Sequence, residues 1–164
     1  MEDDLKVSHA PRGYNCPFCA LIDGRNAAGL RADEADVVER SAHTTTLVAN
    51  TRWPANPVML LVVPDDHHEN IYTLPDQTAA ELAAAARRAA IACRVALGAD
   101  GVTVRQHNEP ASHQTVWHLY LQVIPRWHGD RLYERHAEQG EHPAQERAEF
   151  ADRLRAALPG ATAR

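Results

Sequence analysis

QTVWHLYLQVIPR, residues 114–126, is the most informative stretch of this sequence. It predicts a β-strand over residues 116–124, in which side chains two positions apart share a face. One face of this strand is apolar and is expected to be the core side: Trp117, Leu119, Leu121 and Val123. The other face aligns His118, Tyr120 and Gln122. A row of imidazole, phenol and amide groups suggests a functional site, although a half-exposed strand with chance polar residues would look the same.

The loop that leads into this strand is rich in hydrogen-bond donors. Imidazole, amide and hydroxyl groups come from His107, Asn108, His113, Gln114 and Thr115. Several donors in one tight connection can be presented to a phosphate group. Arg126, just beyond the strand, adds a guanidinium that can pair with an anion through two hydrogen bonds. The loop carries most of this phosphate-binding prediction, because single surface arginines are common.

A metal site is predicted by Cys16-Pro17-Phe18-Cys19, whose spacing lets two thiolates reach one zinc ion. Redox dithiols use the same spacing, but they lie in a βαβ context, and nothing before Cys16 looks like a buried strand. A closed tetrahedral site needs two more ligands. The best candidates are His67, or its neighbour His68, and His118 on the polar strand face.

The remaining pattern predicts a single α+β domain. Strands are expected at 36–41, 44–50, 58–63 and 101–106, with a loop at 51–57. Helices are expected at 16–23, 78–97 and 142–158. Thr78 and Glu81 have the spacing of a capping box for the longest helix, and Gly98 is its expected stop. The strand at 58–63 is uninterrupted in its apolar character, which is typical of a central strand covered on both faces.

Composition excludes several classes of protein. The formal charge of −5 over 164 residues argues against a non-specific nucleic-acid binder, since those need basic faces. No apolar run approaches the roughly 20 residues of a membrane helix, so no membrane partner is expected. The acidic start of the chain lacks the features of a signal peptide. Three cysteines, two of them closely paired, favour a reducing compartment, and we expect the cytoplasm.

The stretch 114–126 resembles the signature of the histidine triad (HIT) family, in which Q-[ST]-V-x precedes H-x-H-x-H. Here the triad reads His-x-Tyr-x-Gln, through His118, Tyr120 and Gln122. The pair Cys16 and Cys19 is similar to the family's N-terminal CxxC. The segment 61–67 is similar to its strand-Pro-x-x-His segment. The similarity covers roughly residues 14–133, in the order of the family.

The resemblance implies a five-stranded antiparallel sheet with packed helices, usually paired into a homodimer, and a nucleotide or nucleotide-like ligand. It also implies a structural zinc ion held by four residues: Cys16, Cys19, His67 and His118. We expect a flexible N-terminus at 1–12, a HIT-like domain at 13–135 and a C-terminal helical extension at 136–164.

In the family, the middle histidine attacks the α-phosphorus and then passes the nucleotidyl group to water or another acceptor. Tyr120 stands in that position. Gln122, in the third position, is similar to the galactose-1-phosphate uridylyltransferase branch. His113 stands where the family usually has glycine. Asn50 stands where many members have an aspartate for the ribose hydroxyls, and residues 57–59 lack the usual Gly-His.

The expected function is a nucleotidyl transferase or nucleotide hydrolase, with Tyr120, Gln122 and His113 as catalytic residues. A phenol has an unperturbed pKa of about 10, so a nucleophilic tyrosine needs a nearby cation. His113, His128 and Arg126 are the candidates for that cation. Two alternatives remain: a zinc-stabilised nucleotide-binding module without catalysis, and a HIT fold recruited to a different reaction.

Overall fold

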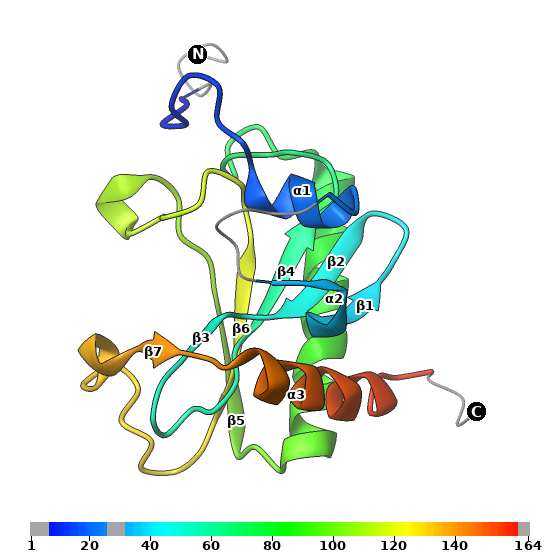
Figure 1. Cartoon of the computed structure of the whole chain (residues 1–164), viewed down its shortest axis with the longest axis vertical. Coiled ribbons are helices and arrows are strands. Elements are labelled where there is room, and N and C mark those ends of the chain that lie inside the picture. Colours follow the sequence, from blue (N-terminus) through cyan, green and yellow to red (C-terminus); the bar gives the residue numbers. More distant parts are fainter. Residues whose placement is uncertain (1–6, 26–31, 161–164) are drawn as a thin grey trace.

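A computed structural model describes residues 7–25 and 32–160 (Figure 1). Its centre is a five-stranded antiparallel sheet in the order β1-β2-β4-β6-β5, which confirms the predicted α+β fold. The strands are β1 (Val37–Arg40), β2 (Thr44–Val48), β4 (Leu60–Pro64), β5 (Gly101–Arg105) and β6 (Leu121–Arg126). Residues 1–6 of the expected flexible N-terminus lie outside the described residues. Ser8 and His9 are tied to the carboxylate of Glu69.

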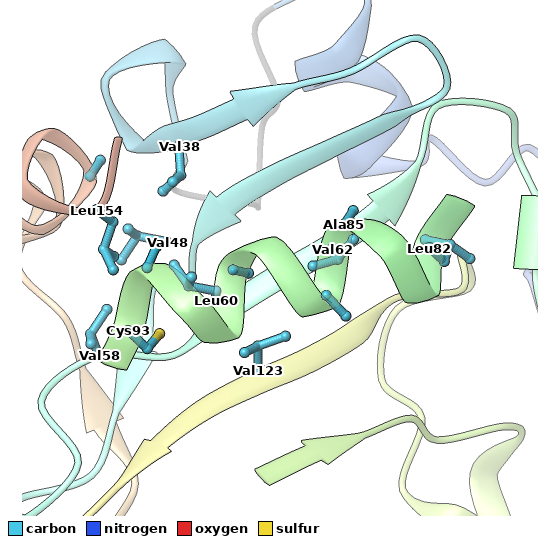
Figure 2. Close-up of a cluster of buried hydrophobic side chains, with 14 of the residues drawn as sticks. Val38, Val48, Val58, Leu60, Val62, Leu82, Ala85, Cys93, Val123 and Leu154 are labelled. Atoms are coloured by element: carbon cyan, nitrogen blue, oxygen red, sulfur yellow. The ribbon is translucent and has the colours of Figure 1, made fainter. Parts of the chain in front are cut away.

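The long helix α2 (Asp76–Leu97) lies along one face of the sheet (Figures 1 and 2). Gly98 ends it in the left-handed conformation, as predicted. The predicted capping box of Thr78 and Glu81 is wrong, because the helix begins two residues earlier, after Pro75. There the fixed φ of proline starts the first turn, and Asp76 places a carboxylate near the positive end of the helix.

The central strand β4 is covered on both faces, as its apolar sequence predicted. Its even-numbered residues, Leu60 and Val62, pack against α2 in one hydrophobic cluster (Figure 2). Its odd-numbered residues, Leu61 and Val63, belong to a second cluster on the opposite face. There Phe18 of the short helix α1 (Pro17–Ile22) packs over the sheet. Helix α1 therefore covers part of the sheet face that is opposite α2, and this cover shapes the site described below.

The predicted strand at 116–124 begins later than expected, at Leu121. Residues before it leave the ladder, because the amide of Leu119 donates to the carbonyl of His68 and that of Trp117 donates to the Tyr14 hydroxyl. Leu119, Leu121 and Val123 pack on the α2 side, as predicted. Trp117 does not join that cluster, and its ring packs against His9 instead.

The C-terminal residues fold onto the same sheet. Helix α3 (Ala144–Ala156) contacts β1, β2 and α2 and buries Ala151 and Leu154. The short strand β7 (Gly140–Glu141) pairs with β3 (Thr51–Arg52), which lies inside the predicted loop 51–57. Because of this pairing, residues 136–141 reach the face of the sheet that is opposite α2. In the part of the chain that is described, no helix is long and apolar enough to cross a membrane.

Candidate functional site

Three separate segments of the chain bring the four predicted metal ligands together. Cys16 precedes α1 and Cys19 lies within it, while His67 follows β4 and His118 precedes β6. One ligand atom from each residue falls within 4.8 Å of all the others. His68 is not part of this cluster, so the choice that the sequence left open falls to His67.

The separations between these atoms fit a tetrahedral zinc ion. Nδ1 of His118 lies 3.2 Å from Sγ of Cys16 and 3.6 Å from Sγ of Cys19. Nδ1 of His67 lies 3.3 Å from Sγ of Cys19. Bonds of about 2.3 Å to sulfur and about 2.0 Å to nitrogen place neighbouring ligand atoms roughly 3.5 Å apart. Two thiols and two imidazoles are also a donor set that zinc prefers.

The ring of His118 is oriented for metal binding by a second contact. Its Nε2 lies 3.0 Å from the carbonyl oxygen of Pro64, which accepts a hydrogen bond and leaves Nδ1 as the free ligand atom. Burial lowers the pKa of His118 from 6.5 to about 4, which keeps the imidazole neutral. Burial, and then Cys16, raise the pKa of the Cys19 thiol to about 12 without a metal. A dication would reverse that shift by favouring the thiolate.

Beside this cluster, a cavity of about 590 Å³ opens on the face of the sheet opposite α2. Its floor follows one row across the sheet, because Arg105 of β5 pairs in register with Gln122 of β6, and Gln122 with Leu61 of β4. Tyr120 lies two residues before Gln122 and also lines the floor. Phe18 holds the Tyr120 ring in an edge-on contact, with 5.5 Å between ring centroids.

Six of the nine residues predicted for catalysis or for phosphate or substrate binding line this cavity: Asn50, His107, His113, Thr115, Tyr120 and Gln122. Gln114 and Asn108 do not, because their side chains brace the loop. Gln114 Nε2 donates to the Glu69 carbonyl at 2.7 Å, and Asn108 Oδ1 accepts from the Ile71 amide at 2.9 Å.

Arg126 also lies outside the cavity. It shares a face of β6 with Gln122 but stands four residues further on, about 13 Å along a strand. Its guanidinium is held by both carboxylate oxygens of Asp130, at 2.6 and 2.7 Å, and by Thr103. His128 does not line the cavity either. Its backbone amide donates a hydrogen bond to the carboxylate of Asp100. Two of the three cations that the sequence offered to Tyr120 are thus placed elsewhere.

Sequence reasoning missed the cation that lies on the cavity floor. Arg105 Nε donates to Gln122 Oε1 at 2.5 Å, and its guanidinium carbon lies 5.5 Å from the centroid of the Trp53 ring. Burial lowers the pKa of Arg105, while negative charge on Tyr133 and Tyr120 would act in the opposite direction. Only the pairing register of β5 with β6 reveals this residue, and a single sequence does not contain that register.

Two further lining residues come from the C-terminal segment, and the sequence gave no signal for them. His136 lies in a short 3₁₀ turn (His136–Glu138) next to β7, and its carbonyl accepts a hydrogen bond from Trp53 Nε1 at 3.0 Å. Gln139 Nε2 donates to Thr51 Oγ1 at 3.0 Å and joins the segment to β3. Both residues are exposed, so they form the mouth of the cavity.

The cavity is suited to an anion although the whole chain is acidic. No aspartate or glutamate is found among its described lining residues, whereas Arg105 and three imidazoles are: those of His107, His113 and His136. Burial lowers the pKa of His136 first, and positive charge on Arg105, His113 and His107 lowers it further. These four groups therefore give the cavity a positive potential that favours an anion.

Two residues of the loop before β6 have backbone angles that normally require glycine. His113 has φ 67° and ψ 30°, in the left-handed region, and Glu109 has φ 65° and ψ 165°, a conformation largely restricted to glycine. Each such conformation costs on the order of 1–3 kcal/mol. The strain at His113 presents an imidazole at the cavity, where glycine would offer no side chain.

Comparisons with known proteins agree with this architecture. Residues 33–129 match the model of the HIT domain. Over 117 residues, the chain is 30% identical to an uncharacterized HIT-like protein of Mycobacterium tuberculosis, a match that covers 71% of this chain and 75% of that protein.

Solved structures give the same result. A Zn-bound histidine triad family protein from Mycobacterium smegmatis is similar with a TM-score of 0.71 and 30% identity, covering 88% of this chain and 93% of that one. A Hit-like protein involved in cell-cycle regulation from Bartonella henselae is similar with a TM-score of 0.71 and 29% identity, covering 88% and 97%.

Proposed function

The chain belongs to the HIT domain family, and from that premise we propose that its cavity binds a nucleotide or nucleotide-like compound. In this proposal the protein acts at a phosphate ester or anhydride of the bound compound, as a nucleotidyl transferase or a nucleotide hydrolase. The observation that carries this proposal is the cavity floor, where a tyrosine, an amide and an arginine lie side by side, with no carboxylate among the lining residues that the structure describes.

Each floor residue has a defined part in this proposal. Arg105 occupies the side-chain oxygen of Gln122, which leaves the amide nitrogen of Gln122 to donate to a phosphate oxygen. Thr115 and His113 add a hydroxyl and an imidazole from the strained loop. Asn50 lines the cavity on the side of β2 and β3, where it would contact the nucleoside. Such fixed donors favour the charge that develops on a transferring phosphoryl group.

Tyr120 is the nucleophile in this proposal. An unperturbed phenol is ionised in roughly one molecule in a thousand at pH 7. Arg105 lines the same cavity as Tyr120 and is the cation that this step would use. The phenolate oxygen attacks phosphorus, the bond to the leaving group breaks, and the leaving oxygen takes up the proton that the phenol lost. A tyrosyl phosphodiester results.

The second step consumes that diester. Water or an acceptor hydroxyl attacks the same phosphorus, and the phenolate leaves and is reprotonated. Phenolate is a poorer leaving group than a protonated imidazole, so this step should be slower than from a histidyl intermediate. Transfer to an acceptor held in the cavity therefore suits this site better than fast hydrolysis.

We propose zinc as the metal of the four-ligand cluster. The donor set and the spacing of its atoms support this choice, as does the Zn-bound relative from Mycobacterium smegmatis. A zinc ion there would have a structural role, because four protein ligands leave no open position for a substrate. It would tie α1 to the segments around His67 and His118, and so fix Phe18 against Tyr120.

The test is intact-mass spectrometry after incubation with a mixed panel of nucleotides and sugar nucleotides. The wild type and Tyr120→Phe, which removes only the phenolic oxygen, are compared. We expect a nucleotidyl adduct on the wild type alone, mapped to Tyr120. If the nucleotides are neither attached nor consumed, the enzymatic proposal is wrong for that panel.

A second candidate function is a zinc-stabilised nucleotide-binding module without catalysis. The replacement of the usual nucleophile by Tyr120 favours it. Tight binding of a nucleotide without its consumption would support this module. The absence of any nucleotide binding would instead favour a different reaction in a cavity rebuilt around Tyr120, His107 and His113.

The family suggests a homodimer and the cysteine content suggests the cytoplasm, and we include both in the proposal. Strand β5 is an edge of the sheet and exposes Val104, which leaves this edge open to a second copy. The support for the cytoplasm is that two of the three cysteines belong to the metal cluster, since such thiols are kept reduced there. Sedimentation that shows a monomer at micromolar concentration would remove the dimer from the proposal.

A further inference from the structure

The positive groups of the cavity extend beyond the place where a single reacting phosphate would lie. Tyr120 and Gln122 mark that place on the floor. Arg105 stands next to Gln122, on the neighbouring strand, and its guanidinium still has nitrogens that do not contact Gln122. His136 stands at the mouth, and both His136 and Arg105 contact the ring of Trp53. A second position that can bind an anion is thus available between the floor and the mouth of the cavity.

Trp53 fixes the geometry of this second position. The indole packs under the Arg105 guanidinium, and its ring lies 5.6 Å from the ring of His136. Its Nε1 donates to the His136 carbonyl, so the 3₁₀ turn is anchored to a fully buried residue. Trp53 therefore contacts both Arg105 and His136 and fixes their positions at the same cavity.

We propose that Arg105 and His136 form a second anion subsite, which selects substrates that carry another phosphoryl group next to the reacting one. This inference rests on the proposed function and adds to it the class of substrate. The reacting phosphate contacts Tyr120 and Gln122, and the adjacent phosphoryl group contacts the guanidinium and the imidazole. The guanidinium lies between the two phosphates and contacts both.

The groups around His136 disfavour protonation of its imidazole, so this cation of the subsite forms only when a phosphoryl group binds. Burial, and then Arg105 from β5 with His113 and His107 from the loop, lower the pKa of this imidazole. On its own segment, Arg135 and Glu138 neutralise each other in an ion pair. A bound phosphoryl group reverses the balance, so the imidazole takes up a proton as the ligand enters.

The test compares two sets of ligands by isothermal titration calorimetry. One set holds the four common nucleoside 5′-monophosphates, and the other holds their α,β-methylene diphosphate analogues, which cannot be cleaved between the phosphates. The wild type should bind the preferred diphosphate at least tenfold more tightly than its monophosphate. His136→Gln should reduce this ratio to below threefold and leave monophosphate affinity nearly unchanged.

The matched control is His43→Gln. His43 is an exposed histidine in the turn between β1 and β2, away from the cavity. This variant should keep the wild-type ratio. A double-mutant cycle with Arg105→Gln adds a second readout, because two residues that hold one phosphoryl group give non-additive losses of diphosphate affinity. Additive losses would overturn the shared subsite.

Proton uptake separates binding from a merely structural role of His136. Titrations in two buffers of different ionisation enthalpy give the protons taken up per diphosphate bound. The uptake by the wild type should exceed that by His136→Gln, since the ionisation of the ligand is common to both. Equal uptake would overturn the role of this imidazole.

The outcomes also separate this inference from the function on which it rests. If monophosphates bind but diphosphates bind no more tightly, the second subsite is wrong and nucleotide binding stands. If the wild type binds no member of either set, both the subsite and the proposed function are overturned.

Discussion

Arg105 of β5 and Gln122 of β6 are paired across the sheet and joined by a hydrogen bond, from the guanidinium Nε to the amide oxygen. The amide has two ends with opposite hydrogen-bonding character, and this contact uses the accepting end. The donating end is left for the cavity. The pairing register of β5 with β6 thus determines that the cavity floor offers a hydrogen-bond donor from Gln122.

Gln122→Glu tests this orientation. The carboxylate keeps the contact with Arg105 but has no hydrogen to donate, and its negative charge repels a phosphate. We expect the affinity for a bound nucleoside monophosphate to fall at least tenfold, about 1.4 kcal/mol, in calorimetric titrations. Gln77→Glu, at the exposed start of α2, is the matched control and should bind like the wild type.

Cys16→Ser tests the metal centre. Removal of one of the four ligands should reduce zinc from about one ion per chain to nearly none, and it should lower the melting temperature. Metal content by atomic emission and melting by circular dichroism measure both effects. Cys93→Ala changes a buried cysteine on α2 that is far from the cluster, so its zinc content should stay at one. A wild type that is folded as purified but carries no zinc would contradict the assignment.

Acid should destabilise the metal-free chain through His118. Its pKa is depressed to about 4 in the folded state, against 6.5 for the unfolded chain, so the unfolded state binds more protons between these values. The free energy of unfolding should therefore fall as the pH drops from 6.5 to 4, by on the order of 3 kcal/mol. Urea unfolding at several pH values, in the presence of a chelator, measures it. His118→Asn should lose this component, and His43→Asn should retain it.

The buried ion pair between Asp36 and Arg147 should be important for the attachment of α3. Nε of Arg147 lies 3.0 Å from Oδ1 of Asp36, and the two side chains are only 5% and 1% exposed. Arg147→Ala leaves a buried carboxylate without its counter-charge, which costs about 3–5 kcal/mol. Chemical unfolding measures this loss. The exposed Arg87→Ala on α2 should change stability by less than about 0.5 kcal/mol.

The left-handed backbone at His113 predicts a trade-off between the stability of the fold and nucleotide binding. Glycine and, to a lesser degree, asparagine accept such a conformation with little strain. His113→Gly and His113→Asn should therefore raise the unfolding free energy, by up to about 1 kcal/mol. Both should weaken nucleotide binding, because the imidazole is lost. Variants that are destabilised but bind normally would show that the loop is not strained for function.

Much of the fold could be read from the sequence because its signals are local. The apolar run of β4, the alternation around Gln122 and the stop at Gly98 each depend on neighbouring residues. The start of α2 could not be read as well, since two competing N-terminal signals lie within three residues and Pro75 prevails over Thr78.

The site divides in the same way. The ligand types and Tyr120 are visible in the motifs, whereas their partners are set by long-range packing. Arg105 enters the cavity through strand register, and His136 through the pairing of β7 with β3. Arg126 was expected at the phosphate because it is close in sequence, but distance along the strand and Asp130 keep it away.

The pairing of β3 with β7 has a consequence for how such a protein can diversify. Residues 136–141, which supply the mouth of the cavity, lie beyond the matched domain at 33–129. Ligand preference can therefore be inherited, or grafted, separately from the sheet and its metal cluster. A chimera that exchanges only residues 136–141 between two relatives would change which ligand the cavity prefers and would leave Tyr120 and Gln122 unchanged.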